Sequence, residues 1–341
     1  MKQLCKNNLG GGQKSCQNKY RLSIVDIMQG IAMLWVIIGH HLLDFMPLIY
    51  KSVHYYIYSF HMPLFIFISS FLIAYSYKEI SYKDYVYRKF RKFFIPYALV
   101  GGLVIGLTAM RYGIDIVFKN ILYLLVSPKQ SEATFLWYIY LLFFLYALYP
   151  FCVRGVQKFK IYFEFLLLLI GVYFYLYPIQ ISILCIDYFT KYFLFYVLGL
   201  VAAWHFSFLK MYLNVLKIIG LISFFLFVIL TTYVFVQSRN SIYLMLCFSA
   251  IPAMYGLANI LKFIPSIKKV LINISKNCFH IYLLHMFFIQ GIAWVFMKVY
   301  ACKIESVEIM FFYIVISTTI SIIGPIVLFK LYDKLKLKFI R

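Results

Sequence analysis

Histidines inside apolar segments are the residues of this chain best suited to proton transfer. His40 ends one apolar segment, and His61 lies in the next, two residues before Pro63. A neutral imidazole can take up a proton near neutral pH, and it can also carry a transferred group. Asp44 follows His40 by four residues, the helical spacing at which a carboxylate can orient an imidazole. These types and spacings make His40, His61 and Asp44 candidate catalytic residues.

The first apolar segment carries a polar stripe. Gln29 and His40 are eleven residues apart, which is three helical turns plus about 20°, so they share a face about 16 Å apart along the axis. Asp26 continues that face, whereas His41 points about 100° away from it. The alternative is that His40, His41 and Asp44 lie in the outer headgroup zone and have no chemical role.

Pro63 gives His61 a distinctive setting. A proline in a helix lacks the backbone N–H, so it leaves one carbonyl to be satisfied by a neighbouring group or by water. His61 beside such an irregularity indicates a polar pocket, although a histidine that only packs between helices would give the same pattern.

Other polar residues occur in the later apolar segments. Asp187 and Lys191 are four residues apart and could neutralise each other on one helix. His280 and His285 are separated by about 140° around a helix, so both cannot face one cavity. The histidines and the seven cysteines show no metal-ligand spacing, and the sequence therefore predicts no metal site.

A basic cluster precedes the third apolar segment, between positions 78 and 92. Arg88 and Arg91 in it could bind a polyphosphorylated ligand, because guanidinium groups match phosphate geometry. The same charges would also orient the chain in a membrane and contact anionic lipid. Both interpretations stay open on sequence alone.

Composition defines the elements that must position these residues. The chain has 341 residues, of which 64% are hydrophobic and 13% are charged, whereas soluble domains have about 45–50% and about 25%. This excludes a soluble enzyme, a disordered chain and a coiled coil. The fold class expected is an all-α, polytopic integral membrane protein in the lipid bilayer, and the net charge of +22 indicates membrane orientation rather than nucleic-acid binding.

Hydropathy predicts about ten transmembrane helices, since each needs roughly 20 apolar residues. We expect them near 22–43, 53–76, 93–110, 134–153, 161–177, 181–204, 214–236, 242–261, 278–297 and 308–329. The shorter stretch 114–126 is expected to be interfacial or re-entrant. Residues 1–20 are expected to form a flexible basic cytoplasmic tail, and 21–341 a single membrane domain. With ten crossings most of the 33 basic residues fall on one side, which predicts that both termini are cytoplasmic.

Several of these segments together resemble a known family, the membrane-bound acyltransferase family 3. The first two are the most specific. One begins VDIMQGIA and runs on to the dipeptide GH, and the other reads FHMPLFIFISS. The matching positions are 25–40, 60–70, the pair Arg88 and Arg91, 136–138 and 281–285. The resemblance covers most of the chain. It implies an O-acyltransferase that moves an acyl group, typically acetyl from acetyl-CoA, to a hydroxyl of a cell-surface or lipid-linked carbohydrate.

The resemblance also implies roles for single residues. His40 would be the general base or an acyl relay, and His61 would orient it or donate to the oxyanion. Donor binding would fall to Gln29, Arg88 and Arg91, and acceptor binding to Tyr282, His285 and Trp137. The protein would lie in the plasma membrane, namely the inner membrane of a bacterium. It would use no metal cofactor.

Two departures from the family pattern stand out. Gln29 occupies a position where many members carry arginine, which removes a cation from the expected donor path, and Ser70 stands where glycine is usual. A rival function is a multi-span transporter or flippase for a sugar or lipid-linked sugar. A third alternative is a degenerate family member that only binds or scaffolds.

Overall fold

The computed structural model of this protein describes residues 23–41, 46–237, 243–300 and 306–339, and within these ranges it contains helices and no strands. Seven helical segments are long and apolar enough to cross a membrane, namely Val53–Tyr75, Tyr82–Tyr112, Thr134–Phe159, Ile183–Trp204, Leu213–Leu230, Cys278–Val299 and Val307–Lys334. Four shorter apolar helices are Ser23–Gly39, Ile116–Val126, Ile161–Leu176 and Met245–Leu261. The all-α membrane architecture expected from the sequence is therefore confirmed.

Every expected crossing contains a helix. Three of the four shorter apolar helices coincide with the expected crossings 22–43, 161–177 and 242–261, and Ile116–Val126 coincides with the expected short helix. The count of ten crossings and the cytoplasmic position of the termini stay predictions. The helices are α1 Ser23–Gly39, α2 Leu48–Tyr75, α3 Tyr82–Lys89, α4 Ile95–Tyr112, α5 Ile116–Val126, α6 Trp137–Phe159, α7 Ile161–Leu176, α8 Ile186–Trp204, α9 Phe206–Met211, α10 Leu213–Gln237, α11 Tyr243–Leu261, α12 Pro265–Lys276, α13 Cys278–Tyr300 and α14 Val307–Phe339.

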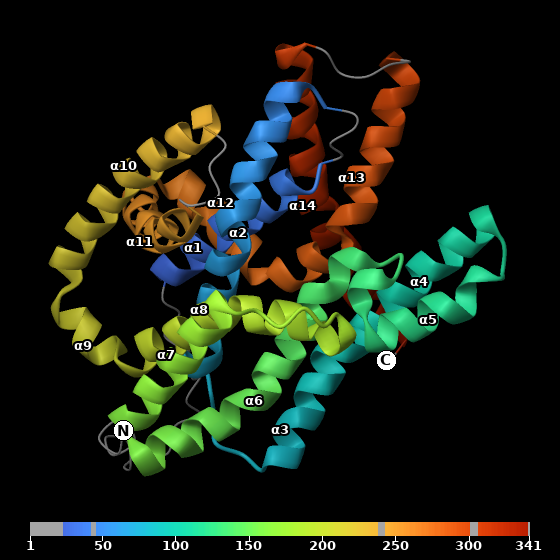
Figure 1. Ribbon diagram of the computed structural model, residues 1–341. Helices are drawn as coiled ribbons and strands as arrows, with labels where there is room; N and C mark the ends of the chain where they lie inside the picture. The colour runs from blue at the N-terminus through green and yellow to red at the C-terminus, as the bar shows by residue number, and fades with distance from the viewer. Residues whose placement is uncertain (1–22, 42–45, 238–242, 301–305, 340–341) are drawn as a thin grey trace.

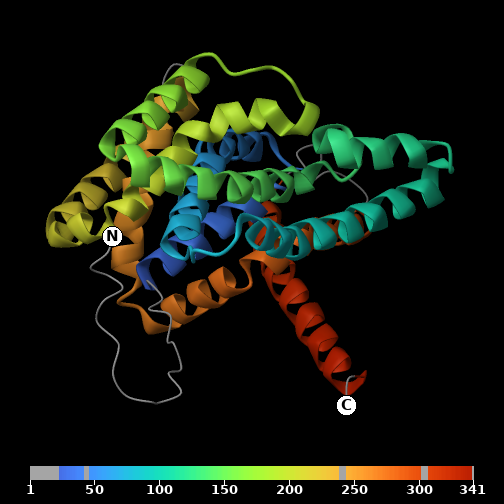
Figure 2. The ribbon, with the colours of Figure 1, turned by 90° about the horizontal axis from the view of Figure 1, so that it is seen from below.

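Helix α2 lies at the centre and packs against α1, α8 and α11 (Figure 1). Helices α13 and α14 pack together beside α1, and α4 and α5 form a hairpin that extends sideways from the bundle (Figures 1 and 2). Close packing of α2 on α8 depends on Gly199, because a Cβ there would overlap Ser70 Oγ and the Phe67 carbonyl. Ser70 is thus accommodated by a glycine on the facing helix.

Helix α12 was not expected from the sequence, because it is too short and too polar to cross a membrane. Pro265 at its first turn is the signal that marks its start. One face of α12 packs on α1 so closely that a Cβ on Gly30 would overlap the carbonyl of Leu271. This short helix therefore fixes the position of the N-terminal half of α1.

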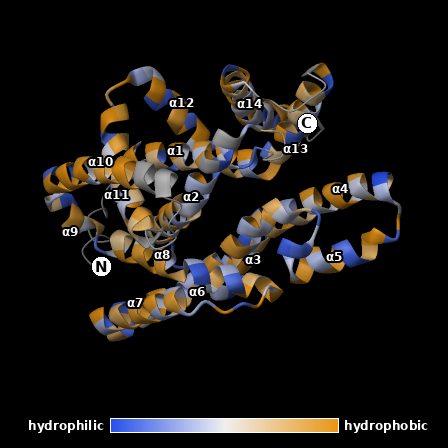
Figure 3. Cartoon of the chain, turned by 45° about the horizontal axis from the view of Figure 1, so that its top comes forward, coloured by the Kyte–Doolittle hydropathy of each residue, from blue (hydrophilic) through white to orange (hydrophobic). Residues whose placement is uncertain are grey.

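Large apolar side chains cover the outer surface of the bundle, and apolar residues colour much of the peripheral helices in Figure 3. Exposed examples on α4 and α10 are Leu99, Leu103, Leu107, Met110, Ile218, Ile222, Phe225 and Ile229. An apolar surface of this extent needs lipid rather than water around it. The structure is that of a multi-pass membrane protein.

Candidate active site

His40 follows the last residue of α1 and is half-buried. Its Nδ1 donates to the carbonyl of Val36 at 2.6 Å. Because a carbonyl can only accept, this bond holds the ring proton on Nδ1 and leaves a lone pair on Nε2. The imidazole therefore presents a basic nitrogen away from its own helix, as a general base or a nucleophile requires.

His61 is held in the same way on α2. It is buried, and its Nδ1 donates to the carbonyl of Ile57 at 2.6 Å, so its lone pair is also on Nε2. Tyr58 joins the two histidines, with its ring centroid 4.7 Å from His61 and 6.1 Å from His40. In this tautomer a neutral His61 accepts hydrogen bonds, and donation to an oxyanion would require its protonated form.

His285 of α13 repeats the pattern a third time. It is fully buried, and its Nδ1 donates to the carbonyl of Tyr282 at 2.8 Å. Its Nε2 is buried without a hydrogen-bond partner in the part of the chain that the structure describes. The His285 ring lies edge to face with that of His40, with centroids 5.1 Å apart. The structure thus brings together a histidine from α2, one from α13 and the histidine that directly follows α1.

A fourth histidine was missed by the sequence analysis. His54 stacks on Tyr58 with ring centroids 4.1 Å apart. The signal that could have found it is spacing, because His54, Tyr58 and His61 follow one another by four and three residues and so share a helix face. We call His40, His54, His61 and His285, with Tyr58 among them, the histidine cluster.

The backbone carbonyl that Pro63 leaves without a donor is hydrogen-bonded by a cysteine. Pro63 cannot donate to the carbonyl of Ser59, which therefore loses its usual partner four residues on. The thiol of Cys247 on α11 donates to that carbonyl, with Sγ 2.9 Å from the oxygen. The expected freed carbonyl thus exists, and a side chain from a neighbouring helix fills its place.

His41 faces α14 instead of the cluster. Its Nε2 lies 3.4 Å from Thr318 Oγ1, its Nδ1 lies 3.5 Å from Ser317 Oγ, and its ring meets that of Tyr313 at 5.3 Å. The two consecutive histidines therefore point to different helices, in keeping with the 100° that separates neighbours on a helix. Asp44, the expected carboxylate partner of His40, lies outside the described residues.

Gln29 is tied to α12. Ser275 Oγ donates to Gln29 Oε1 at 2.7 Å and lies 3.3 Å from Asp26 Oδ1. Asp26 is buried. These contacts place Gln29 eleven residues before His40 on α1, with its carbonyl oxygen already engaged. Gln29 lies in the N-terminal half of α1, about three helical turns before the histidine cluster.

Arg88 and Arg91 are exposed, in α3 and in a π-helical turn at Phe90–Phe94 that follows it. Such turns are rare and often occur at functional sites. Phe93 in this turn contacts Phe279, near the start of α13, at 5.5 Å between ring centroids. From Phe279 to His285 is about 9 Å along the helix. The basic segment therefore lies at the end of the helix that carries His285.

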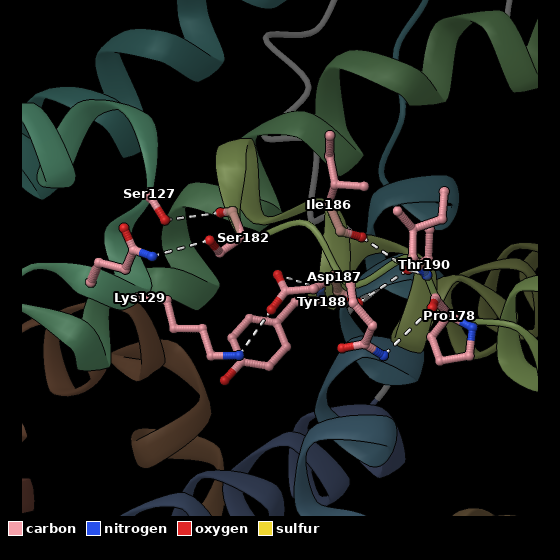
Figure 4. A network of polar contacts seen from close by, with 11 residues as sticks. Ser127, Lys129, Pro178, Ser182, Ile186, Asp187, Tyr188 and Thr190 are labelled. Carbon is pink, nitrogen blue, oxygen red and sulfur yellow. Dashed lines mark hydrogen bonds and ion pairs between the residues drawn. The ribbon is translucent and has the colours of Figure 1, made fainter.

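Tyr282 and Trp137, the other expected acceptor-binding residues, are both packed against protein. Tyr282 is buried and its hydroxyl donates to the carbonyl of Phe135 at 2.6 Å. Trp137 lies against Tyr188 at 4.0 Å and stacks on Tyr192 at 5.9 Å between ring centroids. Tyr282 thus braces the segment before α6, whereas Trp137 is half-buried and contacts Tyr188, one of the residues labelled in Figure 4.

Asp187 pairs with Lys129, not with Lys191 as its spacing suggested. Lys129 Nζ donates to Asp187 Oδ2 at 2.9 Å and lies 4.4 Å from the centre of the Tyr188 ring (Figure 4). The hydrogen bond to the Asp187 carboxylate raises the pKa of Lys129. Asp187 does not pair with Lys191 because the turn before α8 brings Asp187 close to Lys129, in the loop after α5.

Within the described residues no group of three histidine, cysteine, aspartate or glutamate side chains could hold a metal ion. The imidazoles of His40, His61 and His285 each donate from Nδ1 and keep a lone pair on Nε2, with which each can accept a proton.

The comparisons with known proteins agree with the resemblance seen in the sequence. A family model described as an acyltransferase domain matches residues 22–329. No curated protein and no solved structure matches the chain. The match covers nearly all of the helical bundle, including all four members of the histidine cluster. The chain belongs to the acyltransferase 3 family.

Proposed function

We propose that this protein is an O-acyltransferase that moves an acyl group, acetyl in the simplest case, from cytoplasmic acyl-CoA to a hydroxyl of a cell-surface or lipid-linked carbohydrate. The observation that carries the proposal is the hydrogen bond from His40 Nδ1 to Val36. It leaves a basic Nε2 at the end of α1, in a chain whose family is that of acyltransferases.

His40 supplies the base in this reaction. The acceptor hydroxyl gives its proton to His40 Nε2 as its oxygen attacks the thioester carbonyl carbon. A C–O bond forms and the C–S bond breaks, and the proton passes from His40 to the departing thiolate. In a second route a C–N bond forms between His40 Nε2 and the carbonyl carbon as the C–S bond breaks. The hydroxyl oxygen then attacks that carbon, the C–N bond breaks, and the hydroxyl proton goes to the released thiolate. Both routes use the same nitrogen, and isolation of an acylated His40 would select the second.

The donor would approach along α13. Phosphates of the donor would bind Arg88 and Arg91, whose exposed guanidinium groups suit them. The contact between Phe93 and Phe279 supports this path, since it joins the basic segment to the helix that leads to His285. Gln29, held by Ser275, would line the donor path in the N-terminal half of α1 as a neutral group.

The test uses the full chain in proteoliposomes, with labelled acetyl-CoA on the side of the termini and a panel of glycans as acceptors. We expect label to reach a glycan with the native chain and with His41→Ala, and not with His40→Ala. Donor binding is measured separately by equilibrium binding of the labelled acetyl-CoA. A native chain that neither binds the donor nor transfers label would overturn the proposal and favour transport of a sugar.

A further inference from the structure

Lys191 carries a positive charge within a helical segment that is long and apolar enough to cross the membrane. Asp187, four residues earlier, is engaged at both oxygens, since Oδ2 accepts from Lys129 Nζ at 2.9 Å (Figure 4) and Oδ1 accepts from the backbone N–H of Tyr188 at 2.8 Å. Lys191 makes no hydrogen bond or ion pair with any residue that the structure describes. Its Nζ lies 5.5 Å from the centre of the Tyr192 ring, a contact that does not neutralise the charge.

Electrostatic interactions place the ammonium group of Lys191 beside the histidine cluster. Its charge acts on His61 of α2 and on Cys247 of α11. It also repels Lys129, so the single carboxylate of Asp187 serves two ammonium groups, and the net charge of these three side chains is positive. Lys191 is exposed, and a ligand can therefore reach it. An accessible positive charge thus lies close to a histidine of the cluster.

Tyrosine rings connect this charge with His40. Tyr188, three residues before Lys191 on α8, interacts electrostatically with Tyr58 of α2. Tyr58 meets the His61 ring at 4.7 Å and the His40 ring at 6.1 Å between centroids. Tyr58 is exposed and Tyr188 is half-buried, so both can contact a bound sugar through a ring face or a hydroxyl. A molecule bound between Lys191 and His40 would therefore contact both tyrosines.

We infer that Lys191 binds a phosphate group of the carbohydrate acceptor, and that the acceptor is therefore lipid-linked. The inference rests on the proposed function, and it selects one of the two kinds of acceptor named there. Charged side chains inside membrane helices are rare and mark substrate pathways, because an unpaired charge in lipid is costly. An ammonium group binds phosphate as a point charge and donates hydrogen bonds to its oxygens. The phosphate would neutralise Lys191 while the sugar reaches His40.

The depth of Lys191 favours a phosphate that a lipid carries. Lys191 lies five residues after Ile186, the first residue of α8, or about 7.5 Å along the helix axis. The headgroup zone on each side of the hydrocarbon is about 5–8 Å thick, and a lipid-linked sugar places its phosphate there. The predicted orientation, with cytoplasmic termini, puts the start of α8 at the outer surface. The same depth would let Lys191 reach phosphates of the surrounding lipid, which is the alternative that the test must exclude.

Binding is measured on the full chain in phosphatidylcholine nanodiscs, without acetyl-CoA. One probe is a disaccharide joined to a short prenyl chain through a diphosphate, and the other is the same disaccharide joined through an ether bond. Lys191→Gln removes the charge, whereas Lys191→Arg keeps it. Lys298→Gln is the matched control, because Lys298 is also an exposed lysine of a membrane helix, with Nζ 4.2 Å from the centre of the Trp294 ring. It lies about 20 Å along α13 from His285.

We expect the native chain to bind the diphosphate probe about tenfold more tightly than the ether probe, which is the factor that one charge-assisted hydrogen bond contributes. Lys191→Gln should bind both probes alike, whereas Lys191→Arg and Lys298→Gln should keep the preference. Equal affinity of the native chain for the two probes, or a native preference in Lys191→Gln, would overturn the inference. Loss of the preference in nanodiscs of phosphatidylglycerol would assign Lys191 to lipid phosphate and would overturn it too.

Rates of acyl transfer separate the inference from the proposed function. With the diphosphate probe as acceptor, Lys191→Gln should raise the KM for the acceptor about tenfold and leave the KM for acetyl-CoA unchanged. Transfer to both probes by the native chain at equal KM would refute the phosphate site while the proposed function stood. A diphosphate preference that depends on Lys191, in a chain that transfers no acyl group to any acceptor, would refute the proposed function and leave the phosphate site.

Discussion

Two consecutive histidines in this protein have opposite surroundings. His40 donates from Nδ1 to Val36, its Nε2 has no hydrogen-bond partner among the described residues, and its ring lies beside that of His285. His41 has both nitrogens within reach of hydroxyl groups, those of Ser317 and Thr318 on α14, and is buried. The residue type is the same, and the helix that each ring faces decides what it can do.

The contrast separates structural from chemical histidines without reference to relatives. A buried imidazole with both nitrogens hydrogen-bonded stabilises the packing of two helices and has no lone pair to offer. A ring with one nitrogen fixed and the other open is oriented and still reactive. By this criterion His61 belongs with His40, since its Nδ1 is fixed by Ile57 and its Nε2 has no hydrogen-bond partner among the described residues.

The largest effect is expected at His40. His40→Ala removes the base and should lower the rate of acyl transfer by about 10³-fold or more. Membrane insertion should be unchanged, because one imidazole contributes little to the hydropathy of the first apolar segment. Rates are measured in proteoliposomes at equal protein, as judged from the membrane fraction. Activity within tenfold of native would remove His40 from the chemistry.

The next effect is expected at His61. His61→Ala should lower kcat by about 100-fold, because it removes a fixed imidazole that meets Tyr58 within the histidine cluster. His61→Gln, which retains an acceptor, should lose less. If His61→Ala behaved like His41→Ala, the criterion of one fixed and one open nitrogen would not identify reactive histidines.

Arg88 and Arg91 should affect donor binding and leave the chemistry intact. The double change to alanine is expected to raise the KM for acetyl-CoA about tenfold or more, with kcat near native, since charge-assisted hydrogen bonds to phosphates are lost. Added salt should weaken donor binding to the native chain in the same direction. Lys83→Ala, an exposed cation on the same helix, is the control and should leave KM within about twofold.

The smallest effect on activity is expected at His41. His41→Ala should lower the transfer rate no more than about threefold, while it lowers the Tm of the detergent-solubilised protein by several degrees, because a buried ring and its contacts to α14 are lost. Activity and Tm are measured on one preparation. Equal losses of activity at His40 and His41 would contradict the assignment of His40 as reactive and His41 as structural.

Local pattern predicted much of the fold and part of the site. Long apolar stretches placed the membrane helices because a lipid environment leaves the backbone few alternatives to a helix. Helix α12 escaped because its apolar residues are confined to one face and it is short. Helical geometry predicted that His40 and His41 diverge, and they do so although both follow the last residue of α1.

Contacts between distant segments could not be predicted. The meeting of His40 with His285 joins residues far apart in the chain, and no local pattern fixes which two helices pack together. Asp187 found Lys129 across two loops instead of its helical neighbour. The sequence predicted that Tyr282 binds the acceptor, yet its hydroxyl donates a hydrogen bond to the carbonyl of Phe135.

The thiol of Cys247 has a practical consequence for experiments that use cysteine chemistry. It completes the backbone of α2 at Ser59, two residues before His61, so its modification or replacement would disturb the cluster from outside. A cysteine-free background made for site-directed labelling should therefore carry Cys247→Ser, which keeps a donor, in preference to Cys247→Ala. Loss of activity when a maleimide modifies Cys247 would report loss of its hydrogen bond to Ser59, with no nucleophilic cysteine required.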